Sequence, residues 1–301
     1  MDHAGPMTIR ICHLYPSLLS VAGDRGNLLA LTRRCAWRGI GTSVAEADVG
    51  VAPDFSTFDL ILLHGGQDCE MRVAARDLGA KAGSLRDAVE DGVVVLAVCA
   101  GYQLLAKYYA PVDGEPITGI GVLDAVTEGG GTRFMSHIAV DCDLGQGRQR
   151  TLVGFENHSG RTYLGPGADP LGRVIAGSGN NGEDGTEGAR YREVYATYLH
   201  GPVLPKNPWL TDHLISRALL HRYRDAGTPD ALEALEALED QTETEAHTAA
   251  LRLACRPAGR RRAATAALPR WWRAGSQRPA ASGRAARDDQ AAGAGMAWTS
   301  R

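Results

Sequence analysis

Short apolar runs alternate with amphipathic segments along the first hundred residues. A helix is predicted from Asn27 to Trp37, and a second helical stretch ends at Gly92, because apolar residues recur there at three- and four-residue spacing. The apolar runs predict four strands, at 9–14, 42–45, 59–63 and 93–97. Strands that are apolar on both faces and separated by helices are typical of a parallel sheet covered on two sides. The pattern therefore predicts an α/β fold.

The second half of the chain has a different pattern. Residues 114–184 are rich in glycine, and their candidate strands, at 137–142, 152–155 and 173–176, are short. We expect them to be antiparallel additions to the edge of the sheet, which makes the sheet mixed but mostly parallel. A last strand at 193–199 precedes a helix at 209–224. We place one domain over 1–228 and a peripheral helix over 229–255.

Charge separates the end of the chain from the rest. The whole sequence has a net charge of −3, whereas residues 256–301 hold ten Arg, no Lys and two acids, a local charge of +8, which leaves −11 for residues 1–255. The tail is rich in Ala, Gly and Arg, so we predict that it is disordered. A basic arm could bind nucleic acid or a membrane surface, but we favour a solvated extension and expect no nucleic-acid partner.

The longest apolar run, Val93 to Ala100, has eight residues, and the N-terminal residues carry an early acid. We therefore expect no membrane span, no secretory signal and a cytoplasmic location. The six cysteines form no CxxC pair. Disulfide frameworks and structural zinc sites are therefore disfavoured, and we expect no metal site.

The candidate chemistry begins where the fourth strand ends. Cys99 lies between the apolar strand and a predicted helix, with Ala97, Ala100 and Gly101 as small neighbours. A nucleophile on a sharp strand-to-helix turn needs small neighbours, and the start of a helix favours the thiolate. A buried structural cysteine is the alternative, but the position at a strand end favours a nucleophile.

His200 is the best candidate for the base, because it also follows a predicted strand and precedes Gly201-Pro202. Parallel strands end at the same edge of a sheet, so Cys99 and His200 are expected to meet there. His13, His64 and His158 are weaker alternatives. The third element is Gly65-Gly66-Gln67-Asp68, again just past a strand. Its backbone N–H groups, with that of Ala100, could bind an oxyanion.

Several motifs together resemble a known family. The segments LAVCAGYQ at 96–103 and YLHGP at 198–202 resemble the class I glutamine amidotransferases of the cobyric acid synthase-like branch. Within that branch the chain looks like the glutaminase subunits of lipid II isoglutaminyl synthase. The finer resemblance covers about residues 7–225 and rests on LYP at 14–16, GDRGN at 23–27, RCAWRG at 34–39, GGQD at 65–68, GFENHSGRT at 154–162 and LPKNP at 204–208.

The resemblance implies a class I amidotransferase fold, with helices on both faces of the sheet, and a reaction. Cys99 would attack the side-chain amide of glutamine, His200 would protonate the departing ammonia, and a thioester would be hydrolysed to glutamate. Arg133 matches the glutamine-binding arginine of the family, although an exposed loop arginine is an equal alternative from the sequence. The remaining candidate substrate-binding residues are Gly65, Gly66, Gln67, Ala100, Gln103, Asn157 and His158.

The resemblance also implies a partner. Ammonia would pass to a Mur-ligase-like synthetase subunit of the MurT type, which uses ATP and Mg²⁺ to amidate the D-glutamate α-carboxylate of lipid II to D-isoglutamine. This chain would need no cofactor and would meet lipid II only through that partner. A glutaminase of the cobyrinate pathway is the main alternative, but no GxxxxGK[ST] phosphate loop is present for a fused synthetase. A non-catalytic scaffold of the same fold is the other.

The sequence departs from the family in one place that matters for mechanism. The commonest class I enzymes have Glu two residues after the catalytic histidine, where this chain has Pro202. The site is then either a dyad, or it takes an acid from elsewhere, including from a partner chain. We expect low activity without the partner. Asp24 and Asn27 are assigned to the rim of the site or to the partner surface. Near the oxyanion loop, His64 and Cys69 also depart from the subfamily.

Overall fold

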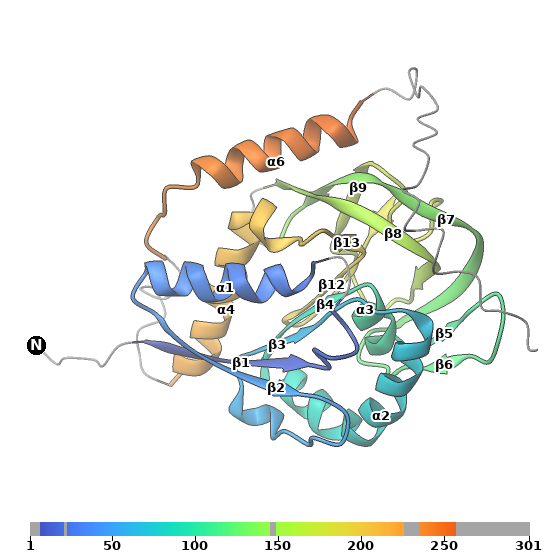
Figure 1. The fold of residues 1–301 in the computed structure, drawn as a ribbon, viewed down its shortest axis with the longest axis horizontal. Coiled ribbons are helices and arrows are strands. Elements are labelled where there is room, and N and C mark those ends of the chain that lie inside the picture. The colour runs from blue at the N-terminus through green and yellow to red at the C-terminus, as the bar shows by residue number, and fades with distance from the viewer. Residues whose placement is uncertain (1–6, 21–22, 145–148, 226–234, 257–301) are drawn as a thin grey trace, which may run out of the picture. The chain divides into compact units, whose positions relative to one another are not determined.

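The computed structural model describes residues 7–20, 23–144, 149–225 and 235–256. Its first sheet has six strands in the order β11-β12-β4-β3-β1-β2 (Figure 1). All neighbours in it are parallel except β11 and β12. The strands are β1 (Thr8–Leu14), β2 (Gly41–Ala47), β3 (Leu60–Leu63), β4 (Val94–Val98), β11 (Ala189–Tyr191) and β12 (Val194–Thr197). The four predicted N-terminal strands and the mixed, mostly parallel sheet are confirmed.

Helices cover both faces of this sheet, as predicted. On one face, α2 (Asp68–Asp91) and α3 (Ala100–Leu105) pack against side chains such as Leu63 and Val95. On the other, α1 (Arg25–Trp37) and α4 (Pro208–Tyr223) pack against Leu62 and Leu96. Successive residues of a strand thus pack into the cores on opposite faces of the sheet, which is why β3 and β4 are apolar throughout.

The glycine-rich half forms a second sheet, so the expectation of antiparallel additions to the first sheet is wrong. Two long strands, β7 (Ala125–Cys142) and β8 (Arg150–Leu164), pair antiparallel along most of their length. The sheet is completed by β5 (Tyr108–Ala110), β6 (Ile117–Thr118), β9 (Gly172–Ala176), β10 (Thr186–Glu187) and β13 (Leu199–His200). The edge strand beyond β12 is β11, which comes from residues after the glycine-rich region, and only an isolated bridge between Asp169 and Arg190 extends that edge.

The chain passes from the first sheet to the second next to the predicted base. β12 ends at Thr197 in the first sheet, and β13 pairs with β8 in the second, with Leu199 opposite Glu156 and His200 opposite Phe155. The carboxyl ends of β3 and β4 lie at the same place. The junction of the two sheets therefore positions the candidate site.

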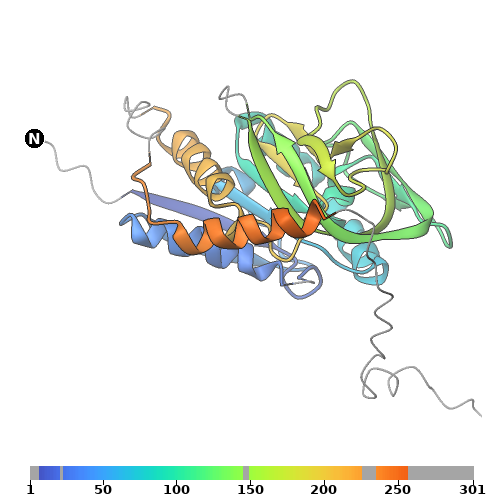
Figure 2. The ribbon, with the colours of Figure 1, turned by 90° about the horizontal axis from the view of Figure 1, so that it is seen from above.

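The C-terminal helix differs from its prediction at the start. The predicted helix covers 229–255, whereas α6 runs from Gln241 to Ala254, and residues 226–234 lie outside the described part of the chain. Arg38 donates to the Glu236 carbonyl, and Arg34 binds Asp240. These contacts hold 235–240 in a non-helical form against α1. α6 then crosses the outside of the second sheet (Figure 2), where Ala250 packs with partners on β7 and β8.

No helix among the described residues is both long enough and apolar enough to span a membrane. The predicted disordered tail begins at Arg256, and its remaining residues, 257–301, lie outside the described part.

Candidate active site

Cys99 occupies a strained turn between β4 and α3. Its φ is +52° and its ψ is −102°, a left-handed conformation that side chains rarely adopt without a functional reason. Gly101 allows the turn, because a Cβ there would lie 2.2 Å from the carbonyl oxygen of Leu63. The Cys99 N–H donates to the Thr197 carbonyl (2.9 Å). The strand, turn and helix thus place this thiol beside the chain that carries His200.

His200 is buried at the junction of the sheets, with 3% of its surface exposed. Its Nδ1 lies 3.3 Å from Oδ2 of Asp24, which leaves Nε2 for Cys99. Burial alone would lower the pKa of His200, but the charge of Cys99 and the hydrogen bonds to Asp24 and Cys99 outweigh it and raise the pKa to about 10. His200 is therefore an imidazolium at neutral pH.

Asp24 supplies the carboxylate that the sequence lacks after His200. It is fully buried immediately before α1, so its expected place on the rim of the site or on the partner surface is wrong. Its Oδ2 also accepts the N–H of Gly65 (3.2 Å). Pro202, which stands where a glutamate was expected, packs so closely on Gly26 that a Cβ there would lie 2.5 Å from its Cγ. The loop after His200 thus lies against the start of α1, next to Asp24.

The sequence contained one sign of this role. Asp24 stands in the turn Gly23-Asp24-Arg25-Gly26, directly before a predicted helix. Only the packing of α1 against the loop after His200 brings this side chain to the base. Asn27 is also buried, and its Oδ1 accepts the N–H of Leu204 (2.9 Å), so it holds the same loop.

The backbone N–H groups predicted to bind an oxyanion differ in their contacts. The N–H of Gly65 donates to the carboxylate of Asp24, which faces the base. Gly66 and Ala100 remain candidate donors, since the N–H of Ala100 lies in the first turn of α3, where no earlier helical carbonyl accepts it. Gly66 also allows close packing, because a Cβ there would lie 2.3 Å from Leu19 Cδ2. Gln67 is exposed at the start of α2.

Arg133 lies on an irregular part of β7, where the register with β8 shifts between Gly129 and Phe134. It is exposed, and its guanidinium donates to the side-chain and main-chain oxygens of Asn157 at 2.6 and 3.2 Å. The structure thus brings two of the predicted substrate-binding residues together. The Nε and Nη2 groups of Arg133 are occupied by Asn157.

His158 is close enough to both this arginine and the base to feel their charges. Burial first, and then the positive charges of Arg161, His200 and Arg133, lower the pKa of His158 to about 3. The imidazole is therefore neutral, and its Nδ1 donates to the Gly160 carbonyl (2.9 Å), so its Nε2 is an acceptor. The ring stacks on Tyr198 at 3.7 Å between centroids.

Gln103 is buried beneath these rings. Its Nε2 donates to the hydroxyl of Tyr198 (3.2 Å), and that hydroxyl also bonds Thr162 (2.7 Å). The side chain of Gln103 therefore holds the ring of Tyr198, on which His158 stacks. The role of Gln103 in binding substrate stays a prediction.

The alternative bases are also accounted for. His13 and His64 are buried and bond each other, with 3.1 Å between His13 Nε2 and His64 Nδ1. In the described ranges, no group of three or more His, Cys, Asp or Glu residues is placed to hold a metal ion.

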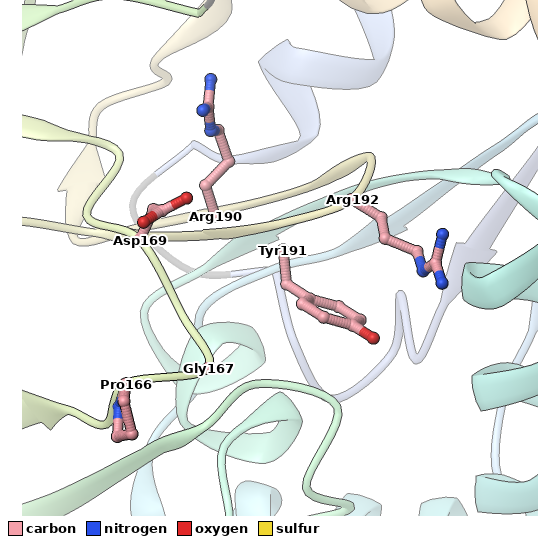
Figure 3. A pocket seen from close by; sticks show the side chains of 6 residues that line it. All are labelled: Pro166, Gly167, Asp169, Arg190, Tyr191 and Arg192. Carbon is pink, nitrogen blue, oxygen red and sulfur yellow. The ribbon is translucent and has the colours of Figure 1, made fainter.

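A surface pocket of about 220 Å³ lies at the other end of β12 from His200 (Figure 3). It is formed by the β11–β12 turn and a neighbouring loop, and its lining residues are Pro166, Gly167, Asp169, Arg190, Tyr191 and Arg192. Arg192 is already paired with Glu90 (2.6 Å), and the hydroxyl of Tyr191 bonds the same carboxylate. This pocket is separate from the cluster around Cys99.

Comparison with known proteins matches residues 10–208 to the CobB/CobQ-like glutamine amidotransferase domain. This segment contains Asp24, Cys99 and His200. It ends before most of α4 and leaves out α6.

The chain is 40% identical over 210 residues to the lipid II isoglutaminyl synthase (glutamine-hydrolyzing) subunit GatD of Staphylococcus aureus (strain N315), covering 70% of this chain and 84% of that one. It is 38% identical to the corresponding GatD subunit of Streptococcus pneumoniae (strain ATCC BAA-255 / R6), covering 72% and 83%. The cobyric acid synthase of Pelotomaculum thermopropionicum is 30% identical, but the match covers 56% of this chain and only 34% of that one.

Proposed function

Because the chain belongs to the CobB/CobQ-like glutamine amidotransferase family, we propose that it is the glutaminase subunit of a lipid II isoglutaminyl synthase. It hydrolyses L-glutamine to glutamate and supplies ammonia to a separate synthetase subunit. The observation that carries this proposal is the strained Cys99 turn beside His200 and Asp24. The GatD relatives support the choice of pathway.

The proposed reaction starts from a thiolate at Cys99 and an imidazolium at His200. The Cys99 thiolate attacks the γ-carbon of glutamine, and the oxyanion is stabilised by the N–H groups of Ala100 and Gly66. His200 gives its proton to the amide nitrogen, which leaves as ammonia, and a γ-glutamyl thioester forms. His200 then takes a proton from water, the hydroxide attacks the thioester, and glutamate leaves with Cys99 again a thiolate.

Two side chains from the second sheet are proposed to orient the amino-acid end of glutamine. The guanidinium of Arg133 can bind the α-carboxylate through two hydrogen bonds, and it would give up its contacts with Asn157 to do so. The imidazole of His158 is neutral, and its Nε2 can accept a hydrogen bond from an N–H group.

We place ATP and Mg²⁺ in the partner, a Mur-ligase-like subunit of the MurT type. That subunit would amidate the α-carboxylate of D-glutamate in lipid II to D-isoglutamine, and this chain would contact lipid II only through it. A glutaminase of the cobyrinate type is the second candidate, favoured by the 30% identity to cobyric acid synthase. The higher identity to the GatD subunits, over most of their length, makes it the weaker one.

The test is glutamate release from L-glutamine by the purified chain and by Cys99→Ala, each with and without a co-expressed Mur-ligase-like partner. Release that requires Cys99 and increases with the partner is the expected result. Amidation of lipid II by the complex, with no amidation of a cobyrinate substrate, would separate the two candidate pathways. Absence of release in all samples, or release unaffected by Cys99→Ala, would reject the glutaminase and favour the scaffold.

A further inference from the structure

Two buried histidines contact each other next to the segment that holds Asp24. His13 is the penultimate residue of β1, and His64 directly follows β3. Their exposed fractions are 1% and 0%, and their rings meet edge to face with 5.0 Å between centroids. The hydrogen bond between His13 Nε2 and His64 Nδ1 crosses between two adjacent strands. None of the steps proposed for glutamine hydrolysis uses this pair.

The main chain at His64 contacts both halves of the catalytic pair. The carbonyl of His64 accepts the N–H of Gly101 (3.1 Å), two residues after Cys99. The next residue, Gly65, donates its N–H to the carboxylate of Asp24, which faces His200. A rotation of this short segment would therefore move the Cys99 turn and Asp24 together.

Burial keeps the pair neutral, against the nearby carboxylates. Burial lowers the pKa of His64 to about 4, although the charge of Asp24 opposes this. Burial also lowers the pKa of His13, where Glu46 and Asp48 oppose the shift and Arg25 adds to it. The charged and titratable groups that act on or near His200 are Cys99, Asp24, His64 and His158. Because His64 carries no charge, it does not compete with His200 for the carboxylate.

We propose that His64, held in place by His13, is a positioning residue that sets the protonation of the Cys99–His200 pair through Asp24 and Gly101. This inference rests on the proposed glutaminase function, because it assigns His64 a part in that chemistry. His64 touches neither substrate nor leaving group. It acts by fixing the backbone that holds the carboxylate and the nucleophile turn.

The test measures the rate of Cys99 alkylation by iodoacetamide against pH, resolved by peptide mass spectrometry from alkylation of the exposed Cys69 and Cys255. The upper step of this profile reports the loss of the His200 proton. In His64→Leu, which cannot bond His13, we expect this step to move down by about one pH unit, because Asp24 is no longer held opposite His200. His64→Gln can still bond His13 and should restore most of the original profile.

His13→Leu removes the same hydrogen bond from the other side, so it tests the inference even where His64→Leu does not fold. His213→Leu is the matched control, since His213 is also a neutral imidazole, with its Nε2 2.8 Å from the hydroxyl of Tyr195 on β12. We expect this variant to lose stability without moving the profile.

An unchanged upper step in folded His64→Leu or His13→Leu would reduce the pair to a packing role and overturn the inference. Alkylation needs neither glutamine nor the partner. A failure of the proposed glutaminase function would appear separately, as a normal Cys99 profile without glutamate release.

Discussion

At the scale of single residues, the site depends on a carboxylate that comes from the start of α1. Asp24→Asn keeps the shape of the side chain and removes its charge. We expect kcat/KM for glutamine hydrolysis to fall by roughly a hundredfold or more, because the imidazolium loses its counter-charge and its orientation. The alkaline limb, which the His200 pKa of about 10 sets, should also move to lower pH. Steady-state glutaminase assays across pH measure both effects.

Asp54→Asn is a suitable comparison for this variant. Asp54 is a carboxylate whose Oδ1 accepts the N–H of Ser56 at the start of η1 (Phe55–Thr57), distant in the fold from His200. Its loss should leave the pH profile unchanged. Equal activity in Asp24→Asn and Asp54→Asn would show that the reaction proceeds with the Cys99–His200 pair alone, or with an acid from the partner.

Glu187 is a second buried carboxylate, and its effect is on stability. Burial raises the pKa of Glu187 to about 7, against the hydrogen bonds from Thr197 and Tyr198. The folded protein binds this proton more tightly than the unfolded chain. The resulting stability is therefore fully present below the unfolded pKa, about 4.5, and is lost as pH rises through 7.

We predict that Glu187→Gln removes this pH dependence. Wild type should lose about 3 kcal/mol of unfolding free energy between pH 4.5 and 7 relative to the variant, as 1.36 kcal/mol per pKa unit implies. The Glu187 Oε2 has no hydrogen-bond partner among the described residues, so the amide that replaces it lowers the stability by the same amount at every pH. The prediction therefore concerns only how steeply the unfolding free energy changes with pH. Urea unfolding at several pH values measures it, and parallel curves would contradict the prediction.

At the scale of elements, the nucleophile turn requires α3 to lie directly against β3. Gly101→Ala would place a Cβ 2.2 Å from a main-chain oxygen of Leu63, which cannot rotate away. We expect α3 to shift, Cys99 to leave its position and glutaminase activity to fall at least about tenfold, with a loss of stability of roughly 1–3 kcal/mol.

Gly79→Ala in α2 is the matched control. A Cβ at Gly79 would meet nothing within 4 Å, and alanine stabilises a helix interior by about 0.5–1 kcal/mol relative to glycine. We expect a higher melting temperature and normal activity. A similar response of both variants would mean that the close approach at Gly101 does not hold the turn.

The elements differ in how far the sequence predicts them. β3 and β4 are buried on both faces, so their apolar runs are continuous and easily recognised. β7 has 18 residues, but its middle is exposed or half-buried and includes three consecutive glycines, so only its last third carries a strand pattern. Asp24 shows the same limit at the site. Local sequence indicates a turn before a helix, whereas its meeting with His200 depends on a contact 176 residues apart.

At the scale of the whole molecule, one charged cluster joins three distant parts of the chain. Arg34 on α1 is 3% exposed and pairs with Asp212 on α4 (2.6 Å) and with Asp240, just before α6. Arg38 pairs with Asp212 as well (2.8 Å). Beyond Asp240, His247 of α6 bonds the Lys206 carbonyl in the loop after His200 (2.9 Å). The C-terminal segment, residues 235–254, therefore holds in place the helix that begins beside Asp24 and the loop that follows His200.

We predict that Arg34→Met detaches this segment. The variant leaves the Asp240 carboxylate without its guanidinium, while Asp212 keeps Arg38, so the loss should be about 3 kcal/mol, at the lower end for a broken buried ion pair. Limited proteolysis should cleave near residues 235–240 much faster than in wild type. Asp240→Asn should reproduce the cleavage with a smaller loss of stability, because the amide oxygen can still accept from Arg34. Wild-type protease resistance in both variants would mean that packing of α6 on β7 and β8 alone holds the segment.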